Sequence, residues 1–260
     1  MKAALSKPLI IGATGGSGTR VLARIVRDGG LFLGAHLNES EDAIEFGAFS
    51  DRWVNKYIRA LREQGEEALE GAMRRDLEGV LQSHCASLAL DVNPPFWGWK
   101  EPRSIYLLPF WQRVFPAFKF LHLVRDGRDM ALSGNQNQLA KHGPALLSWR
   151  ERWLSRPARS MLLWNRINTM AADYGAQQMT GRYLLVRFED LCAEPRREVR
   201  RIFSFCELGE EAVERAVREI APPPTLGRWQ QEPRKRVLTL ERLGARALTR
   251  FGYLGPQANV

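Results

Sequence analysis

A glycine-rich segment near the start of the chain, GATGGSGTR at 12–20, carries residue types that bind phosphate-like anions. Glycines let backbone N–H groups approach an anion closely, and the hydroxyls of Ser17 and Thr19 can donate further hydrogen bonds. A nucleoside-triphosphate loop would carry a lysine immediately before Thr19, where this chain has Gly18. We interpret the segment as an anion-binding loop without that lysine; the alternative is a tight turn whose glycines serve only close packing. The candidate anion-binding residues are Gly15, Gly16, Ser17, Gly18, Thr19 and Arg20.

An arginine and a serine eight residues apart form a second candidate anion site. In FLHLVRDGRDMALS, Arg125 ends an apolar run and Ser133 falls on the helix expected after it. Arginine suits a phosphate because its planar guanidinium offers a fork of donors. If the run is a strand of a parallel sheet, Arg125 emerges at the carboxyl edge, where ligands gather, beside the glycine-rich loop. The structural alternative is that Arg125 pairs with Asp126 or Asp129 and caps the helix.

Short apolar runs predict the strands that would position these segments. The run KPLIIGA at 7–13 is typical of a buried parallel strand, and 118–124 and 182–188 resemble it. Shorter strands are expected at 31–34 and 95–100. If these strands are parallel, the glycine-rich loop and Arg125 lie at the same edge of the sheet.

Helical periodicity separates the apolar runs. The expected helices cover 20–30, 45–87, 104–115, a stretch from Gly127, 145–179 with an interruption near Pro157, and a segment from Pro195, followed by a tail of short helices and basic loops. This alternation predicts an α/β fold, a P-loop NTPase-like three-layer sandwich with a central parallel sheet and helices on both faces. No repeat or linker divides the chain, so we expect one domain over 1–260.

Composition and charge narrow the classes of function. The chain has 260 residues, 45% of them hydrophobic, which allows a sizeable core. The net charge of +9 indicates an anionic partner, but the basic residues are spread along the chain, so we favour a small polyanionic ligand over nucleic acid. No segment approaches the ~18 apolar residues of a membrane span, and the eight residues before the first strand are too few for a signal peptide.

Three cysteines, Cys85, Cys192 and Cys206, are far apart and form no C-x-x-C pair. This spacing argues against a disulfide framework or a zinc site and fits a reducing compartment. We therefore expect a cytoplasmic protein. Nothing in the pattern indicates its oligomeric state.

Taken together, the motifs resemble the sulfotransferase family that uses 3'-phosphoadenosine 5'-phosphosulfate (PAPS). LVRDGRDMALS at 123–133 is similar to the family's 3'-phosphate signature, an arginine at a strand end and a serine eight residues later. WKEPRSIYLLP at 99–109 resembles the lysine-containing segment before that strand, and 182–208 resembles a later family segment. LGRW at 226–229 looks like the family's C-terminal G-x-W element. The resemblance covers about residues 8–230, with the motifs in the family's order.

The phosphosulfate loop departs from the family pattern. Members usually carry lysine or arginine where this chain has Gly15 and Gly16, although GTR at 18–20 resembles the loop of glycosaminoglycan-type members. We expect Lys100 and Arg20 to replace the missing cation, with Arg103 behind them.

The resemblance implies a reaction and a set of nucleotide contacts. A sulfuryl group would pass from PAPS to a hydroxyl or amine of an acceptor by in-line displacement, releasing PAP, with no metal required. Arg125, Ser133 and Arg228 would hold the 3'-phosphate region, and Phe188, which aligns with an adenine-stacking tyrosine, would contact the base or simply fill the core. The acceptor could be a glycan, a small metabolite, a lipid headgroup or a peptide.

A carboxylate should act as the general base on the acceptor. NESED at 38–42 resembles the E-x-E pattern of glycosaminoglycan-type members, so we predict Glu41 as the base, with Glu39 and Asp42 next and Lys100 as the catalytic cation. The structural alternative is an acidic helix start. His36 and His142 are secondary candidates for the base.

Other residues have structural interpretations that compete with functional ones. His122 falls mid-strand and is expected in the core. The tryptophans could line an acceptor pocket, although most should fill the core. These are Trp97, Trp99, Trp111, Trp149, Trp153 and Trp164.

Two other functions are compatible with the motifs. A P-loop kinase acting on a small hydroxyl compound would bind ATP and Mg²⁺, and the missing lysine counts against it. A non-catalytic PAP-binding protein would use Arg125 and Ser133 yet not depend on Glu41 or Lys100. Comparing PAP with ATP as a ligand distinguishes the first of these from a sulfotransferase.

Overall fold

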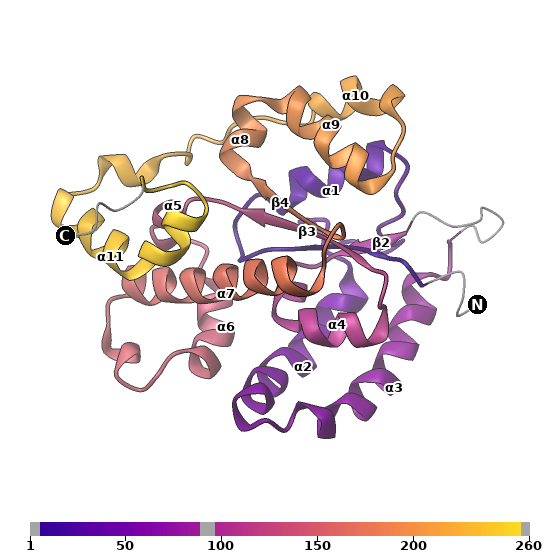
Figure 1. Cartoon of the computed structure of the whole chain (residues 1–260), viewed down its shortest axis with the longest axis horizontal. Helices are drawn as coiled ribbons and strands as arrows, with labels where there is room; N and C mark the ends of the chain where they lie inside the picture. The colour runs from indigo at the N-terminus through magenta and orange to yellow at the C-terminus, as the bar shows by residue number, and fades with distance from the viewer. Residues whose placement is uncertain (1–5, 89–96, 256–260) are drawn as a thin grey trace.

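A computed structural model describes residues 6–88 and 97–255. Its centre is a four-stranded parallel sheet in the order β2-β1-β3-β4 (Figure 1). The strands are β1 (Leu9–Gly12), β2 (Gly98–Lys100), β3 (Lys119–Val124) and β4 (Tyr183–Arg187). The predicted α/β fold with a central parallel sheet is therefore confirmed.

Helices cover both faces of the sheet because each strand is apolar on both sides. The helices are α1 (Thr19–Asp28), α2 (Ile44–Glu63), α3 (Glu66–His84), α4 (Leu108–Val114), α5 (Gly127–Ala131), α6 (Asn137–Leu146), α7 (Arg156–Gln178), α8 (Phe188–Ala193), α9 (Pro195–Cys206), α10 (Val213–Val217) and α11 (Arg234–Arg250). Ile10 packs in a core with α2 and the segment 102–115, whereas its neighbours Leu9 and Ile11 pack against α1 and α9 on the other face. Figure 1 shows α1, α8, α9 and α10 on one side and α2, α3, α4, α6 and α7 on the other.

Some predictions of secondary structure need correction. The expected helix at 45–87 is two helices, α2 and α3, which are separated by Gln64 and Gly65. The segment 31–34 is not a strand of the sheet, because only Phe32 pairs, in a single parallel bridge with Trp97. The expected helix 145–179 is interrupted at 147–155, and Pro157 lies in the first turn of α7 rather than in the interruption. The tail contains the 17-residue helix α11, so it is not made only of short helices. For the predicted strand at 95–100, residues 95 and 96 lie outside the described residues.

No helix among the described residues is long and apolar enough to cross a membrane. In the same part of the chain the three cysteines are free, and no cluster of three or more histidine, cysteine or acidic residues could hold a metal ion.

Candidate active site

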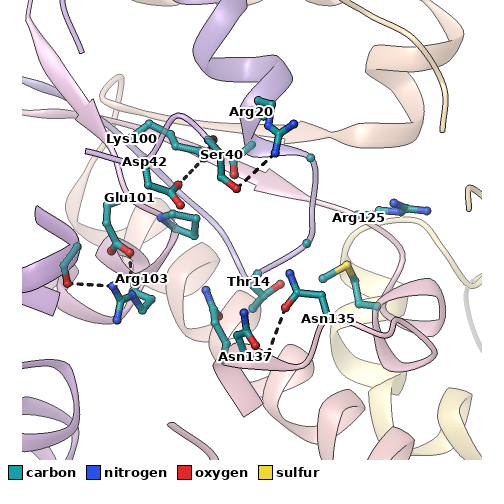
Figure 2. Close-up of a pocket in the computed structure, with 18 of the residues that line it drawn as sticks. Thr14, Arg20, Ser40, Asp42, Lys100, Glu101, Arg103, Arg125, Asn135 and Asn137 are labelled. Atoms are coloured by element: carbon teal, nitrogen blue, oxygen red, sulfur yellow. Dashed lines mark hydrogen bonds and ion pairs between the residues drawn. The ribbon is translucent and has the colours of Figure 1, made fainter. Parts of the chain in front are cut away.

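A cleft of about 980 Å³ lies at the carboxyl edge of the sheet. Its walls come from the β1–α1 loop, the end of β2, the start of α2, the segment after β3 and the first turns of α7. Figure 2 shows Lys100, Asp42, Ser40 and Arg20 gathered on one side of the loop, with Arg125 on the other side. The sequence prediction that the glycine-rich loop and Arg125 lie at the same edge is confirmed.

The glycine-rich loop places the N-terminus of α1 at the cleft. Gly16 and Gly18 have φ values of 85° and 93°, a conformation that side chains other than glycine rarely adopt. Thr19 begins α1, and within the described residues the N–H groups of Gly18, Thr19 and Arg20 donate no backbone hydrogen bond. Free N–H groups at a helix start attract an anion. Ser17, in contrast, is buried, and its hydroxyl donates to the Thr14 carbonyl at 2.6 Å.

Phe188 and Gly18 are in close contact. A Cβ at Gly18 would lie 2.4 Å from the Phe188 ring, so only glycine leaves room for it. The ring lines the cleft from the start of α8, and the Arg125 guanidinium lies 5.4 Å from its centroid. Phe188 thus lies between the anion-binding loop and Arg125.

Arg125 is 5% exposed and fixed by two partners. Its Nη2 donates to Asp129 Oδ2 at 3.0 Å and to the Thr225 carbonyl at 2.5 Å. Its buried Nε has no partner among the described residues. An unpaired buried donor costs free energy, which an anion bound in the cleft would recover.

The segment 225–229 brings a second arginine to the same place. Asp129 accepts hydrogen bonds from the backbone N–H groups of Gly227 and Trp229, at 2.7 and 3.2 Å. Arg228 Nε donates to the Thr225 carbonyl, which Arg125 also contacts. Burial, followed by the positive charge of Arg125, lowers the pKa of Arg228, so the two guanidinium groups repel each other without an anion.

Ser133 lies beyond the end of α5, not on that helix as predicted. Its Oγ accepts a hydrogen bond from Asn135 N at 3.2 Å, and it does not border the cleft. The neighbouring segment 135–138 lines the cleft instead. The role of Ser133 stays a prediction.

Lys100 is a buried cation on the cleft wall, 1% exposed. Its Nζ pairs with the Asp42 carboxylate and donates to the Ser40 carbonyl at 2.6 Å. Burial lowers the pKa of Lys100, and the charge of Asp42 opposes that shift. Arg20 Nη2 lies 3.4 Å from Ser40 Oγ, so both proposed replacements for the loop cation meet at the same turn.

The three acidic candidates point to different places. Glu41 has a φ of 61° and its carboxylate binds Arg24 at 2.7 Å and Arg27 at 3.4 Å, on α1 and outside the cleft. Glu39 is exposed and does not line the cleft either. Only Asp42 lines it. This geometry disfavours Glu41 and Glu39 as the base.

Two features of the cleft were missed from the sequence. Glu101, 3% exposed, accepts from Arg103 Nε at 2.7 Å and Ser50 Oγ at 2.8 Å, and burial raises its pKa. Arg103 also pairs with Asp51. The second feature is the amide run NQNQ at 135–138, whose unusual composition was the available signal.

The histidines are not on the cleft wall. His36 binds Glu45 at the surface, and burial lowers the pKa of His142 to about 4. His122 is fully buried, as predicted, between Tyr183 and Asn168. Four of the six tryptophans are buried, Trp164 lines the cleft, and Trp149 and Trp153 are exposed.

Comparisons with known proteins give one family and one fold. A family model described as "Sulfotransferase family" matches residues 8–211. The chain is similar in structure to the sulfotransferase domain of the curacin biosynthetic pathway, with a TM-score of 0.54 and 14% identity over 97% of this chain and 99% of that one. It also resembles sulfotransferase STF9 from Mycobacterium avium, with a TM-score of 0.55 and 14% identity over 95% and 77% of the two chains. No curated protein sequence matches. At these identities the structural neighbours support the fold alone.

Proposed function

Because this chain belongs to the sulfotransferase family, we propose that its cleft transfers a sulfuryl group from PAPS to a hydroxyl or amine of an acceptor. The observation that carries the proposal is that three cationic groups surround one cleft: the N-terminus of α1, Lys100 on β2, and Arg125 after β3. PAPS carries two separated anionic groups, so a cleft with cations on opposite sides suits it.

We assign the two anionic ends of the donor to opposite sides of the loop. Arg125 and Arg228 would bind the 3'-phosphate, because both lie at the Thr225 carbonyl and Arg125 Nε has no partner in the part of the chain that the structure describes. The N–H groups at the start of α1 would bind the 5'-phosphosulfate, with Lys100 and Arg20 close by. Phe188 would border the adenine between them.

In-line displacement requires a base and a stabilised leaving group. The acceptor oxygen forms the new bond to sulfur while the bond from sulfur to the 5'-phosphate oxygen breaks, so that negative charge develops on PAP. Lys100 and the α1 N-terminus would stabilise that charge. Asp42 would accept the acceptor proton, since it is the candidate carboxylate that lines the cleft. Glu101 is less suited to this role because its side chain is only 3% exposed, whereas that of Asp42 is 23% exposed.

Transfer of label from ³⁵S-PAPS tests this proposal. The purified protein is incubated with ³⁵S-PAPS and a set of hydroxyl-bearing acceptors, and PAP release is measured in parallel. Labelled acceptor with an equal amount of PAP supports transfer. Label recovered only as free sulfate, at the rate seen in buffer, contradicts it.

The kinase alternative gains no support from the loop. Gly18 occupies the position of the phosphate-binding lysine and is held against Phe188. The nearest buried lysine, Lys100, is paired with Asp42.

A further inference from the structure

The connection between α6 and α7 exposes large apolar side chains. We call residues 149–156, WRERWLSR, the tryptophan loop. Trp149 is 67% exposed, Trp153 84% and Leu154 40%, whereas four other tryptophans of the chain are buried. Figure 1 shows this connection projecting at the lower left, where it joins α6 to the N-terminal end of α7. Half of the exposed large apolar residues of the described chain fall within these few positions.

Polar groups turn inward and hold the tryptophan loop in shape. Glu151 binds Arg166 of α7, with 2.5 Å between Oε1 and Nη2, and accepts from Ser148 N at 2.8 Å. This pairing with Arg166 lowers the pKa of Glu151 to about 2, so the carboxylate stays charged at neutral pH. The Trp153 N–H closes a turn on the Arg150 carbonyl at 3.2 Å. The tryptophans are therefore exposed by an ordered turn whose acidic residue faces inward.

The exposed charged side chains around the tryptophans are cationic, although Arg152 Nη2 also donates to the Pro144 carbonyl at 2.7 Å. Arg150, Arg152 and Arg156 are exposed, and none forms a salt bridge with the residues described. The guanidinium of Arg150 lies 5.3 Å from the ring centroid of Trp149. Since Glu151 is neutralised by Arg166, the remaining charged residues of the tryptophan loop, Arg150, Arg152 and Arg156, are all positive.

We propose that the tryptophan loop docks on the surface of an anionic lipid bilayer. Tryptophan partitions to the boundary between headgroups and acyl chains, and arginine binds lipid phosphates while its aliphatic stem covers apolar surface. A protein partner is the less favoured occupant. Stable protein interfaces bury about 800 Å² on each side, whereas this patch offers three apolar side chains on a projecting turn.

Docking would place the cleft near the bilayer. Ser160 and Trp164, one and two turns further along α7, line the cleft. An acceptor carried at the membrane surface would then lie close to the site. The docking itself does not depend on the reaction assigned to the cleft.

Vesicle binding of the full chain tests the proposal. We expect the protein to co-sediment with vesicles of phosphatidylcholine containing 30% phosphatidylglycerol on the order of a hundredfold more tightly than with phosphatidylcholine alone, since each of the three arginines near an anionic surface contributes roughly fivefold. The double variant Trp149→Ala/Trp153→Ala should bind at least tenfold more weakly. Leu238→Ala, which removes an apolar side chain of 52% exposure from α11, is the matched control and should bind like the wild type.

A second measurement does not rely on the variants folding. Brominated acyl chains quench only tryptophans that enter the bilayer, and the wild-type protein should show this quenching with anionic vesicles. Equal binding to both vesicle types, no binding to either, or no quenching overturns the proposal. The proposal is also overturned if the wild-type protein does not bind vesicles but self-associates in sedimentation equilibrium, and the double variant does not self-associate. A second copy of the chain would then be the occupant of the tryptophan loop.

Discussion

Arg125 and Asp129 form a buried ion pair, with 3.0 Å between Nη2 and Oδ2, and the same carboxylate binds the backbone of 227–229. Asp129 thus orients the guanidinium that faces the cleft and also fixes the segment that carries Arg228. Two parts of the chain about a hundred residues apart are joined at one carboxylate. The proposed 3'-phosphate site depends on this connection.

Replacing Arg125 should weaken nucleotide binding. Arg125→Ala removes a charged donor, and we expect the affinity for PAP to fall roughly ten- to hundredfold, since such a donor contributes about 1.5–3 kcal/mol. Calorimetric titration with PAP measures this. Arg24→Ala, on α1 but paired with Glu41 outside the cleft, is the control and should bind PAP like the wild type. Unchanged PAP affinity in Arg125→Ala would place the 3'-phosphate elsewhere.

The two neighbouring carboxylates should behave differently. Asp42→Asn removes the proposed base, so we expect kcat to fall about 10²- to 10⁴-fold while PAP affinity changes little. Glu41→Gln should retain most activity, because that carboxylate binds Arg24 and Arg27 outside the cleft. Steady-state kinetics with PAPS compares them, and Glu39→Gln is the exposed control. An inactive Glu41→Gln beside an active Asp42→Asn would restore Glu41 as the base.

Gly18 should not tolerate a side chain. Gly18→Ala forces alanine to a φ of 93° and places its Cβ against Phe188, so we expect a loss of about 1–3 kcal/mol in the free energy of unfolding and weaker PAP binding. Chemical denaturation and PAP titration measure the two effects. Gly79→Ala, inside α3, adds a Cβ that meets no described atom within 4 Å and should not destabilise the protein. Equal stability of both variants would contradict the packing described for the loop.

His122 should make stability depend on pH. Burial lowers its pKa in the folded state to about 4, below the unfolded value near 6.5. The stabilisation is therefore complete above pH 6.5 and is lost as the pH falls toward 4, amounting to about 2 kcal/mol at pH 5. Denaturation midpoints at pH 7.5 and pH 5 measure this loss. His122→Gln should lose less free energy of unfolding between pH 7.5 and pH 5, and His142 should account for part of the loss that remains. An equal loss in the variant and the wild type would contradict the role given to His122.

Local sequence patterns predicted much of the fold and of the nucleotide side of the cleft. The apolar runs at 7–13, 118–124 and 182–188 each contain a strand of the sheet. Because parallel strands end at one edge, the approach of Arg125 to the glycine-rich loop followed from strand order alone. The family resemblance placed 226–229 near Arg125 but gave no physical reason for it. The structure supplies the reason, because Asp129 accepts a hydrogen bond from the backbone of that segment.

The acceptor side was predicted less well because tight turns set side-chain direction there. Asn38 Oδ1 accepts hydrogen bonds from Ser40 N and Asp42 N, which closes a turn with Glu41 at positive φ. Successive carboxylates therefore point to different sides, and composition alone cannot assign them. Likewise, α5 ends after five residues, which brings 135–138 to the cleft wall and leaves Ser133 off it.

The central claim is that the cleft binds the PAPS nucleotide, and calorimetric titration of the purified protein with PAP, and separately with ATP and Mg²⁺, tests it most directly. We predict that PAP binds with micromolar affinity and that ATP with Mg²⁺ does not bind. Binding of ATP with Mg²⁺ and no binding of PAP would contradict the account and favour a kinase.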